Sequence, residues 1–223
     1  MGISYGGTVQ VRTGAERATL VRRTYSLVLA GVLITILGAT FAFSQPALRG
    51  AVLAHPFLTF LCVFAPLLVA GRMRESNVGS LGLLALFSFV VGVWIAPLVF
   101  LLEQRQPGIA AQAGLLTGSS FAVLTAYAFL SRRDFSAWGG FFTVGLWVLI
   151  ATSLVNIFVR SATADLWIAS ATVLVFSGLL IFDTWRLRHA YGPDDYVPAA
   201  VQIYLDLLNM FLAILRLLGG RRD

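Results

Sequence analysis

Two aspartates near the C-terminus lie inside apolar segments, where charged side chains are rare. Asp183 stands between Ile-Phe and Thr-Trp, and Asp206 stands between Ile-Tyr-Leu and Leu-Leu-Asn. Ionisable residues in such surroundings are costly and mark candidate functional sites. Two carboxyls in contact at low dielectric cannot both ionise cheaply, so they share a proton and titrate as a coupled pair. Such a pair senses pH, and its ionised form offers the oxygen ligands that Ca²⁺ prefers.

The positions of the two aspartates predict that they meet. The apolar blocks 165–187 and 197–218 are separated by Gly-Pro-Asp-Asp at 192–195, so we expect two antiparallel helices joined by a turn. Asp183 lies about eleven residues before the centre of this turn, and Asp206 lies about twelve residues after it. At 1.5 Å rise per residue, both carboxyls lie at nearly the same depth, roughly 10–15 Å from the end of the hairpin.

A simpler arrangement of the same residues is also open. Asp183 could pair with Arg186, one helical turn later, while Asp206 bonds to neighbouring hydroxyl groups. The two aspartates would then be unrelated structural residues. The distance between their carboxyls distinguishes the two interpretations.

Polar residues recur on one face of the last predicted helix. Gln202, Asp206, Asn209 and Arg216 follow one another at intervals of four, three and seven residues, which places them on one helical face. In a helix bathed by lipid, such a stripe must turn toward the other helices or a water-filled cavity. We therefore expect these side chains to point into the bundle, with the last helix surrounded by the others.

The composition indicates a membrane protein. Of 223 residues, 58% are hydrophobic and 12% are charged, whereas soluble domains carry about 25% charged residues. This excludes an intrinsically disordered chain, a secreted disulfide scaffold and an ordinary cytosolic enzyme. The fold class we expect is an all-α membrane protein, a bundle of seven transmembrane helices with the seventh one central. The predicted helices are 25–43, 54–71, 81–102, 109–130, 138–159, 165–187 and 197–218.

The distribution of arginine predicts the orientation. The 16 basic residues are all arginine, and ten of them fall in segments on the side of the N-terminus, so we expect that side to be cytoplasmic. The chain then consists of an Arg-rich cytoplasmic tail (1–24), a transmembrane domain (25–219) and a short C-terminal tail (220–223). The first apolar block is too long for a signal-peptide core, so we interpret it as a retained signal anchor. Seven crossings place the C-terminus outside, unless the last helix does not span fully.

Other classes of site are not favoured. The arginines form no dense run with interleaved aromatic residues, so we expect no nucleic-acid partner. Cys62 is the only cysteine, and His55 and His189 are far apart, so neither an intrachain disulfide nor a structural zinc site is expected. We expect no cofactor. We expect protons to regulate the aspartate pair, and Asp183 and Asp206 are the candidate ligands for a bound cation.

Three segments resemble a known family. Residues 195–219, Asp-Tyr-Val-Pro-Ala-Ala-Val-Gln-Ile-Tyr-Leu-Asp-Leu-Leu-Asn-Met-Phe-Leu-Ala-Ile-Leu-Arg-Leu-Leu-Gly, are similar to the C-terminal signature of the Bax inhibitor-1 family. Phe182-Asp183-Thr184 resembles the aspartate motif at the end of that family's sixth helix. Ser-Arg-Arg-Asp-Phe-Ser at 131–136 is similar to its loop before the fifth helix. The resemblance covers the chain from about residue 20.

The resemblance implies a seven-helix bundle with a central last helix. Bacterial members are implicated in pH-sensitive calcium leak across the cytoplasmic membrane, gated by a pair of aspartates, and Asp183 and Asp206 match that pair. A basic residue at the cytoplasmic end of the second helix is expected to latch onto the pair in the closed state. Arg72 and Arg74 both fit this position, and Arg186 competes with them because it is closer to Asp183 in sequence.

Two rival functions differ in what they require. An intramembrane aspartyl protease also uses one aspartate as base and one as acid, but its second motif is Gly-x-Gly-Asp, and no glycine precedes Asp206 here. We therefore expect no enzymatic activity. A non-conducting regulator would bind a membrane protease or another membrane-protein partner, and the Arg-rich tail could serve it. The leak channel, embedded in a lipid bilayer and conducting Ca²⁺, is the preferred hypothesis.

Overall fold

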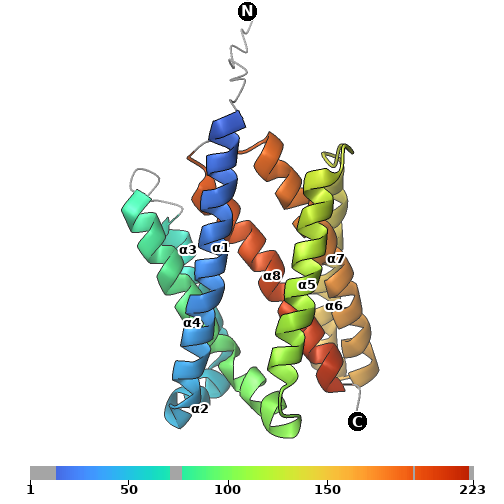
Figure 1. Ribbon diagram of the computed structural model, residues 1–223. Helices are drawn as coiled ribbons and strands as arrows, with labels where there is room; N and C mark the ends of the chain where they lie inside the picture. Colours follow the sequence, from blue (N-terminus) through green and yellow to red (C-terminus); the bar gives the residue numbers. More distant parts are fainter. Residues whose placement is uncertain (1–13, 71–76, 193, 221–223) are drawn as a thin grey trace, which may run out of the picture.

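The computed structural model describes residues 14–70, 77–192 and 194–220, and every regular element in this part of the chain is a helix. Figure 1 shows the helices standing side by side as an elongated bundle. The α7–α8 turn lies at the same end of the bundle as the start of α1. The helices are α1 (Gly14–Phe43), α2 (Pro46–Ala54), α3 (Pro56–Ala70), α4 (Asn77–Arg105), α5 (Ile109–Leu130), α6 (Trp138–Val159), α7 (Ala162–His189) and α8 (Tyr196–Gly219).

The described residues form eight helices, not the seven predicted. Each predicted block lies largely within a helix, and the additional one is α2. Pro46 occupies the first turn of α2, where its fixed φ favours helix and its missing N–H costs nothing. The nine residues of α2 extend only about 14 Å, too short to cross a hydrocarbon core of about 30 Å. In the described part of the chain, six helices, α1 and α4–α8, are long and apolar enough to span a membrane.

The first helix begins at Gly14 rather than near Tyr25. Residues 14–24 contain alanine, glutamate, leucine and arginine, which are good helix formers. Leu20 and Thr24 are also buried, so this stretch has a packed face of its own. The polar segment predicted as a tail therefore contributes its last residues to α1.

Close backbone contact holds α1 against α4. A Cβ atom on Gly38 of α1 would collide with the backbone oxygen of Phe89, and one on Gly92 of α4 would collide with that of Thr35. Small residues allow transmembrane helices to approach in this way. Thr35 strengthens the contact, because its hydroxyl lies 3.0 Å from the Ser88 carbonyl oxygen of α4. The two helices form one closely packed side of the bundle.

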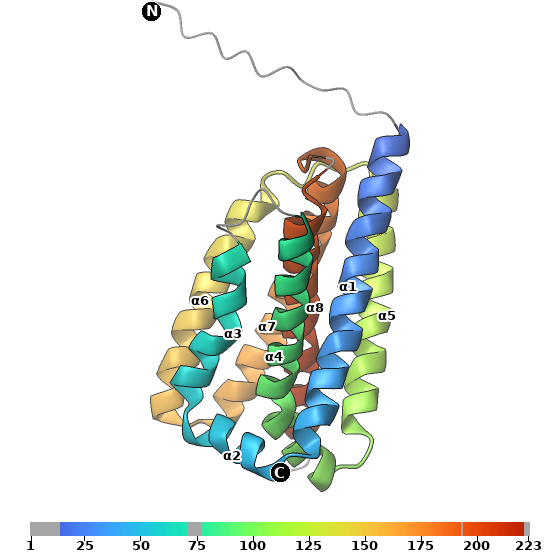
Figure 2. The same ribbon diagram turned by 90° about the vertical axis from the view of Figure 1, so that its left-hand side faces the viewer.

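The last helix joins the two sides of the bundle. In Figure 1, α8 passes between α1 and α4 on one side and α5 and α7 on the other, and it packs against all four. Figure 2 shows α3 and α6 at the periphery, where α3 packs on α4 and α6 packs on α7. The buried face of α8 includes Ala199, Ile203, Asp206, Met210 and Ala213.

The polar stripe of α8 only partly faces inward. Asp206 is buried, and Gln202 and Asn209 are partly buried, but Arg216 is exposed. The prediction that Arg216 points into the bundle is therefore wrong. Arg216 follows Asp206 by ten residues, which turns it about 80° around the helix axis, and its neighbours Ala213, Ile214 and Leu215 take up the buried face.

Candidate functional site

The α7–α8 hairpin places the two aspartates. A short turn links the helices, and the Asp195 carboxylate accepts a hydrogen bond of 2.7 Å from the Gly192 N–H within it. Asp183 lies six residues before the end of α7, and Asp206 lies ten residues after the start of α8. These offsets correspond to about 9 and 15 Å along the helix axes. The two residues therefore approach the same level of the bundle from adjacent helices.

The side chains of Asp183 and Asp206 are close enough to interact with each other across the α7–α8 interface. Both residues are buried, with 7% and 4% of their surfaces exposed. The Oδ2 atom of Asp206 is fully buried, and no donor group in the described part of the chain reaches it. A buried oxygen without a donor is costly, and a proton held between the two carboxyls removes that cost. The geometry agrees with the contact expected from their matched depth, while a role in sensing pH stays a prediction.

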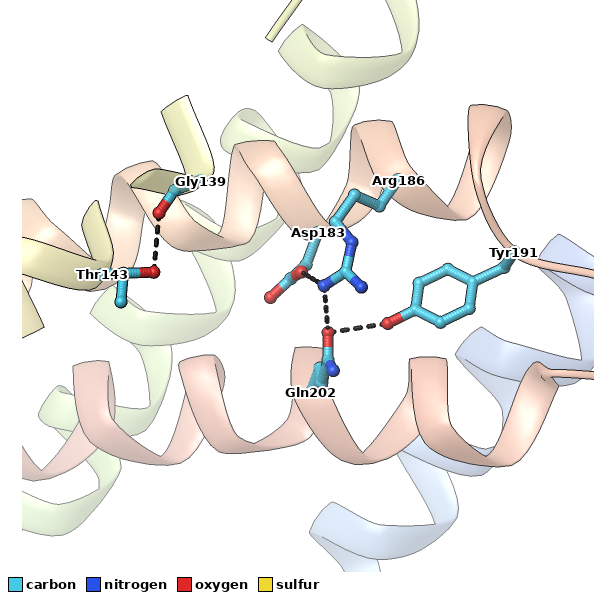
Figure 3. Close-up of polar contacts among 6 residues, drawn as sticks. All are labelled: Gly139, Thr143, Asp183, Arg186, Tyr191 and Gln202. Atoms are coloured by element: carbon cyan, nitrogen blue, oxygen red, sulfur yellow. Dashed lines mark hydrogen bonds and ion pairs between the residues drawn. The ribbon is translucent and has the colours of Figure 1, made fainter. Parts of the chain in front are cut away.

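Arg186 is bound to the same cluster. Its Nη1 atom donates to Asp183 Oδ1 at 3.0 Å and to Gln202 Oε1 at 2.8 Å (Figure 3). The pairing of Asp183 with Arg186 therefore coexists with the approach of Asp206. The alternative arrangement also required Asp206 to bond to neighbouring hydroxyl groups. No hydroxyl of the described residues hydrogen-bonds to Asp206.

Tyr191, in the turn after α7, completes the cluster. Its hydroxyl donates to Gln202 Oε1 at 2.7 Å, and the Arg186 guanidinium lies over its ring, 5.0 Å from the centroid. Burial raises the pKa of the Tyr191 phenol to about 12, so the hydroxyl remains a donor at physiological pH. Sequence analysis missed this residue, because a tyrosine after a helix end has no distinctive spacing.

The charges of the cluster depend on protonation. With one proton on the aspartate pair, its single negative charge is balanced by Arg186. With no proton the cluster carries an extra negative charge, and with two protons Arg186 is left without a counter-charge. Net charge in a buried site is costly. The singly protonated cluster is therefore the form best suited to the packed arrangement, and gain or loss of a proton destabilises it.

Comparison with known proteins identifies the family. The family model described as "Inhibitor of apoptosis-promoting Bax1" matches residues 17–223. The chain belongs to the Bax inhibitor family. Bax inhibitor 1 of Schizosaccharomyces pombe is 33% identical over 207 residues, covering 91% of this chain and 77% of that protein. Mouse protein lifeguard 4 is 32% identical over 217 residues, covering 96% and 90%. An uncharacterized membrane protein of Vibrio cholerae is 38% identical over 151 residues, covering 66% and 67%.

The Bax inhibitor family assignment and the six long apolar helices together establish a multi-pass membrane protein. In this family member, a polar contact beside the aspartates also joins α1 to α7. The Tyr25 hydroxyl lies 3.2 Å from the Thr184 hydroxyl, and Thr184 directly follows Asp183. The backbone that carries Asp183 is thus fixed on two sides, by α8 and by α1.

The remaining predicted site residues are not seen to contact the aspartate pair. Arg72 and Arg74, the candidate latches on the second predicted helix, lie outside the described residues. Asn209 donates to the Leu205 carbonyl of its own helix at 2.8 Å, so this bond is not directed at the aspartates. Within the described residues, no group of three or more His, Cys, Asp or Glu side chains could hold a metal ion.

Proposed function

We propose that this Bax inhibitor family protein is a pH-sensitive Ca²⁺ leak channel of the cytoplasmic membrane, gated by Asp183 and Asp206. The observation that carries the proposal is the contact of two buried carboxyls on adjacent helices, with Arg186 as their counter-charge. An arrangement whose net charge changes with each proton is suited to a sensor. Its position at the interface of α7 and α8 couples that sensor to helix packing.

The proposed membrane arrangement has seven crossings, made by α1 and α3–α8, with the N-terminus in the cytoplasm and α8 central. The packing of α8 against α1, α4, α5 and α7 supports a central position. The arginine distribution supports the orientation. The aspartate pair then lies toward the cytoplasmic end, because the α7–α8 turn and the start of α1 are at the same end of the bundle. Protons of the cytoplasm would regulate it.

The sign of the pH response follows from the charges. Arg186 binds the ionised form of the pair more tightly than the neutral form. Lowering the pH adds a second proton, removes the counter-charge of Arg186 and weakens the bridge from Asp183 through Arg186 to Gln202. The α7–α8 interface then loosens, and the Ca²⁺ flux rises as the pH falls. Tyr191 stays neutral throughout this range, since its pKa is about 12.

The deciding experiment is Ca²⁺ flux into liposomes that contain the purified protein, measured as a function of pH. The variants Asp183→Asn and Asp206→Asn each remove one titrating group and are expected to flatten the pH dependence. Asp194→Asn is the matched control, because Asp194 is an exposed carboxylate in the turn. Its pH profile should equal that of the unmodified protein.

Two outcomes would overturn the proposal. If both asparagine variants keep the original pH profile, the aspartate pair is not the sensor. If the liposomes show no flux at any pH while a membrane protein co-purifies in stable stoichiometry, the protein is a non-conducting regulator that acts through that partner.

A further inference from the structure

An apolar cavity of about 470 Å³ lies between α1, α4, α5 and α8. It is separate from the aspartate cluster. At one end, α1 and α5 are held together by Tyr25, whose ring lies 6.0 Å from that of Phe121 and 6.1 Å from that of Phe129. The cavity begins on α1 at Val32, about 10 Å further along the helix, where α1 and α5 are no longer joined by such contacts.

The cavity opens sideways between α1 and α5. Ile36 and Thr40 form one rim, and Ala111, Gly114 and Gly118 form the other; all five line the cavity and are exposed. Both helices are candidate membrane spans, so these exposed rims face the hydrocarbon of the bilayer. Lipid chains are therefore the molecules that meet this opening.

Among the described residues, every hydroxyl group that lines the cavity already has a hydrogen-bond partner. Its four hydroxyls belong to Thr35, Thr40, Thr117 and Tyr204. The three threonines bond to carbonyl oxygens of their own helices, and the Tyr204 hydroxyl lies 2.6 Å from that of Thr35. Within the described part of the chain, no charged residue lines the cavity. Polar atoms of a ligand would lose their hydrogen bonds here. The apolar lining therefore favours an aliphatic chain as the ligand.

The dimensions fit a chain from one leaflet. Along α1 the lining runs from Val32 to Phe43, about 16 Å, which is half of a hydrocarbon core of about 30 Å. The volume falls in the usual range of ligand pockets, about 300–1,000 Å³. We propose that an acyl chain of a phospholipid from the surrounding bilayer inserts between α1 and α5 and lies against α8.

The glycines of the α5 rim make the site testable. A Cβ atom at Gly118 or Gly114 would meet no neighbouring atom within 4 Å, so a larger side chain can be accommodated and would enter the cavity. Gly118→Phe is the filling variant. Leu115→Phe is its matched control, since Leu115 lies on the same helix less than one turn earlier, is 75% exposed and does not line the cavity.

The experiment uses the full-length protein in vesicles of phosphatidylcholine that carries a photoreactive diazirine on one acyl chain. After irradiation, labelled positions are mapped by mass spectrometry. We expect labelling of α1 residues 32–43 and α5 residues 110–118 to exceed severalfold that of exposed side chains on α6, such as Val144 and Val155. Gly118→Phe should remove this excess, and Leu115→Phe should retain it.

Labelling that is even over all lipid-facing helices would overturn the proposal, because it would indicate ordinary boundary lipid. So would an excess that persists in correctly folded Gly118→Phe protein, as judged by gel filtration and circular dichroism. If that variant does not fold, Ala111→Leu on the same exposed rim takes its place. The labelling requires no Ca²⁺ conduction, so its result is independent of the leak-channel proposal.

Discussion

The Nη1 atom of Arg186 lies 3.0 Å from the Oδ1 atom of Asp183, one turn earlier on the same helix. The Arg186 side chain is 32% exposed and the Asp183 side chain is 9% exposed. The positive charge therefore stands between the buried aspartate pair and the surface. Since the same nitrogen also donates to Gln202 of α8, this arginine links the charge of the pair to the packing of α7 on α8.

Replacing Arg186 by glutamine should raise the resting Ca²⁺ leak without abolishing conduction. The substitution removes a charge-assisted hydrogen bond, and such bonds contribute about 1.5–3 kcal/mol. Because Arg186 is partly exposed, the lower end applies, which corresponds to about a tenfold shift of the closed–open equilibrium. The measurement is initial Ca²⁺ influx into proteoliposomes at neutral pH.

The control for this variant is Arg188→Gln. Arg188 lies on the same helix, but its Nη1 atom donates to the carbonyl oxygens of Ala128 and Phe129 at 3.0 and 2.8 Å. It supports the end of α5 and does not bond to the aspartates. We expect its resting leak to be unchanged. Equal leaks in both variants would show that loosening α7, rather than freeing the aspartate pair, opens the pathway.

Replacing Tyr191 by phenylalanine should destabilise the protein by about 1 kcal/mol, the contribution of one hydrogen bond. The lost bond is the one from the Tyr191 hydroxyl to Gln202. Thermal unfolding in detergent at neutral pH measures this difference. A variant as stable as the original protein would show that Arg186 alone satisfies the Gln202 oxygen.

The same residue makes a prediction about alkaline pH. The phenol of Tyr191 has a pKa of about 12 in the folded protein against an ordinary value of 10.0, because burial disfavours the phenolate. A raised pKa stabilises the folded state below about pH 10, and this contribution is lost as the pH rises from about 10 to 12. The difference in tyrosinate absorbance between the original protein and Tyr191→Phe should therefore titrate near pH 12. A midpoint at 10 would contradict the burial of the phenol.

Adding a methyl group at Gly92 should destabilise the α1–α4 contact. The new Cβ atom collides with the backbone oxygen of Thr35, which cannot move without separating the helices. Overpacking of this kind costs about 1–3 kcal/mol or more. Gly82→Ala on the same helix is the control, since its Cβ meets open space and alanine favours helix by about 1 kcal/mol. Opposite shifts of the melting temperature are expected for the two variants.

The contact of the two aspartates could be predicted from sequence because it depends on few quantities. A constant helical rise, a short turn and nearly equal offsets from that turn are sufficient to bring Asp183 and Asp206 to one level. The alternative pairing with Arg186 also follows from helical spacing. Sequence could not show that both hold together, since that depends on which rotamers the long side chains adopt between α7 and α8.

Other features depend on contacts that helical periodicity does not encode. The short helix α2 falls between the predicted blocks 25–43 and 54–71, and it begins at Pro46 because proline is favoured in the first turn of a helix. Arg49 of α2 donates to the Ala42 and Phe43 carbonyl oxygens at the end of α1. The periodicity of the sequence does not indicate this tertiary contact. Arg216 lies about 80° around the helix axis from Asp206, and the spacing alone does not tell how wide a sector of α8 the neighbouring helices cover.

The two aspartates should differ in how their asparagine variants affect stability. Asp206→Asn keeps the Asp183–Arg186 ion pair and supplies an amide N–H as a donor to the neighbouring carboxylate, so we expect a change below about 1 kcal/mol. Asp183→Asn removes the partner of Arg186. Breaking a fully buried pair costs about 3–5 kcal/mol, and the 32% exposure of Arg186 reduces this to about 1–3 kcal/mol. The double variant Asp183→Asn/Arg186→Gln should recover most of that loss, because it removes the unpaired charge. Unfolding in detergent at neutral pH tests all three, and a double variant less stable than Asp183→Asn alone would show that Arg186 stabilises the site through packing rather than charge.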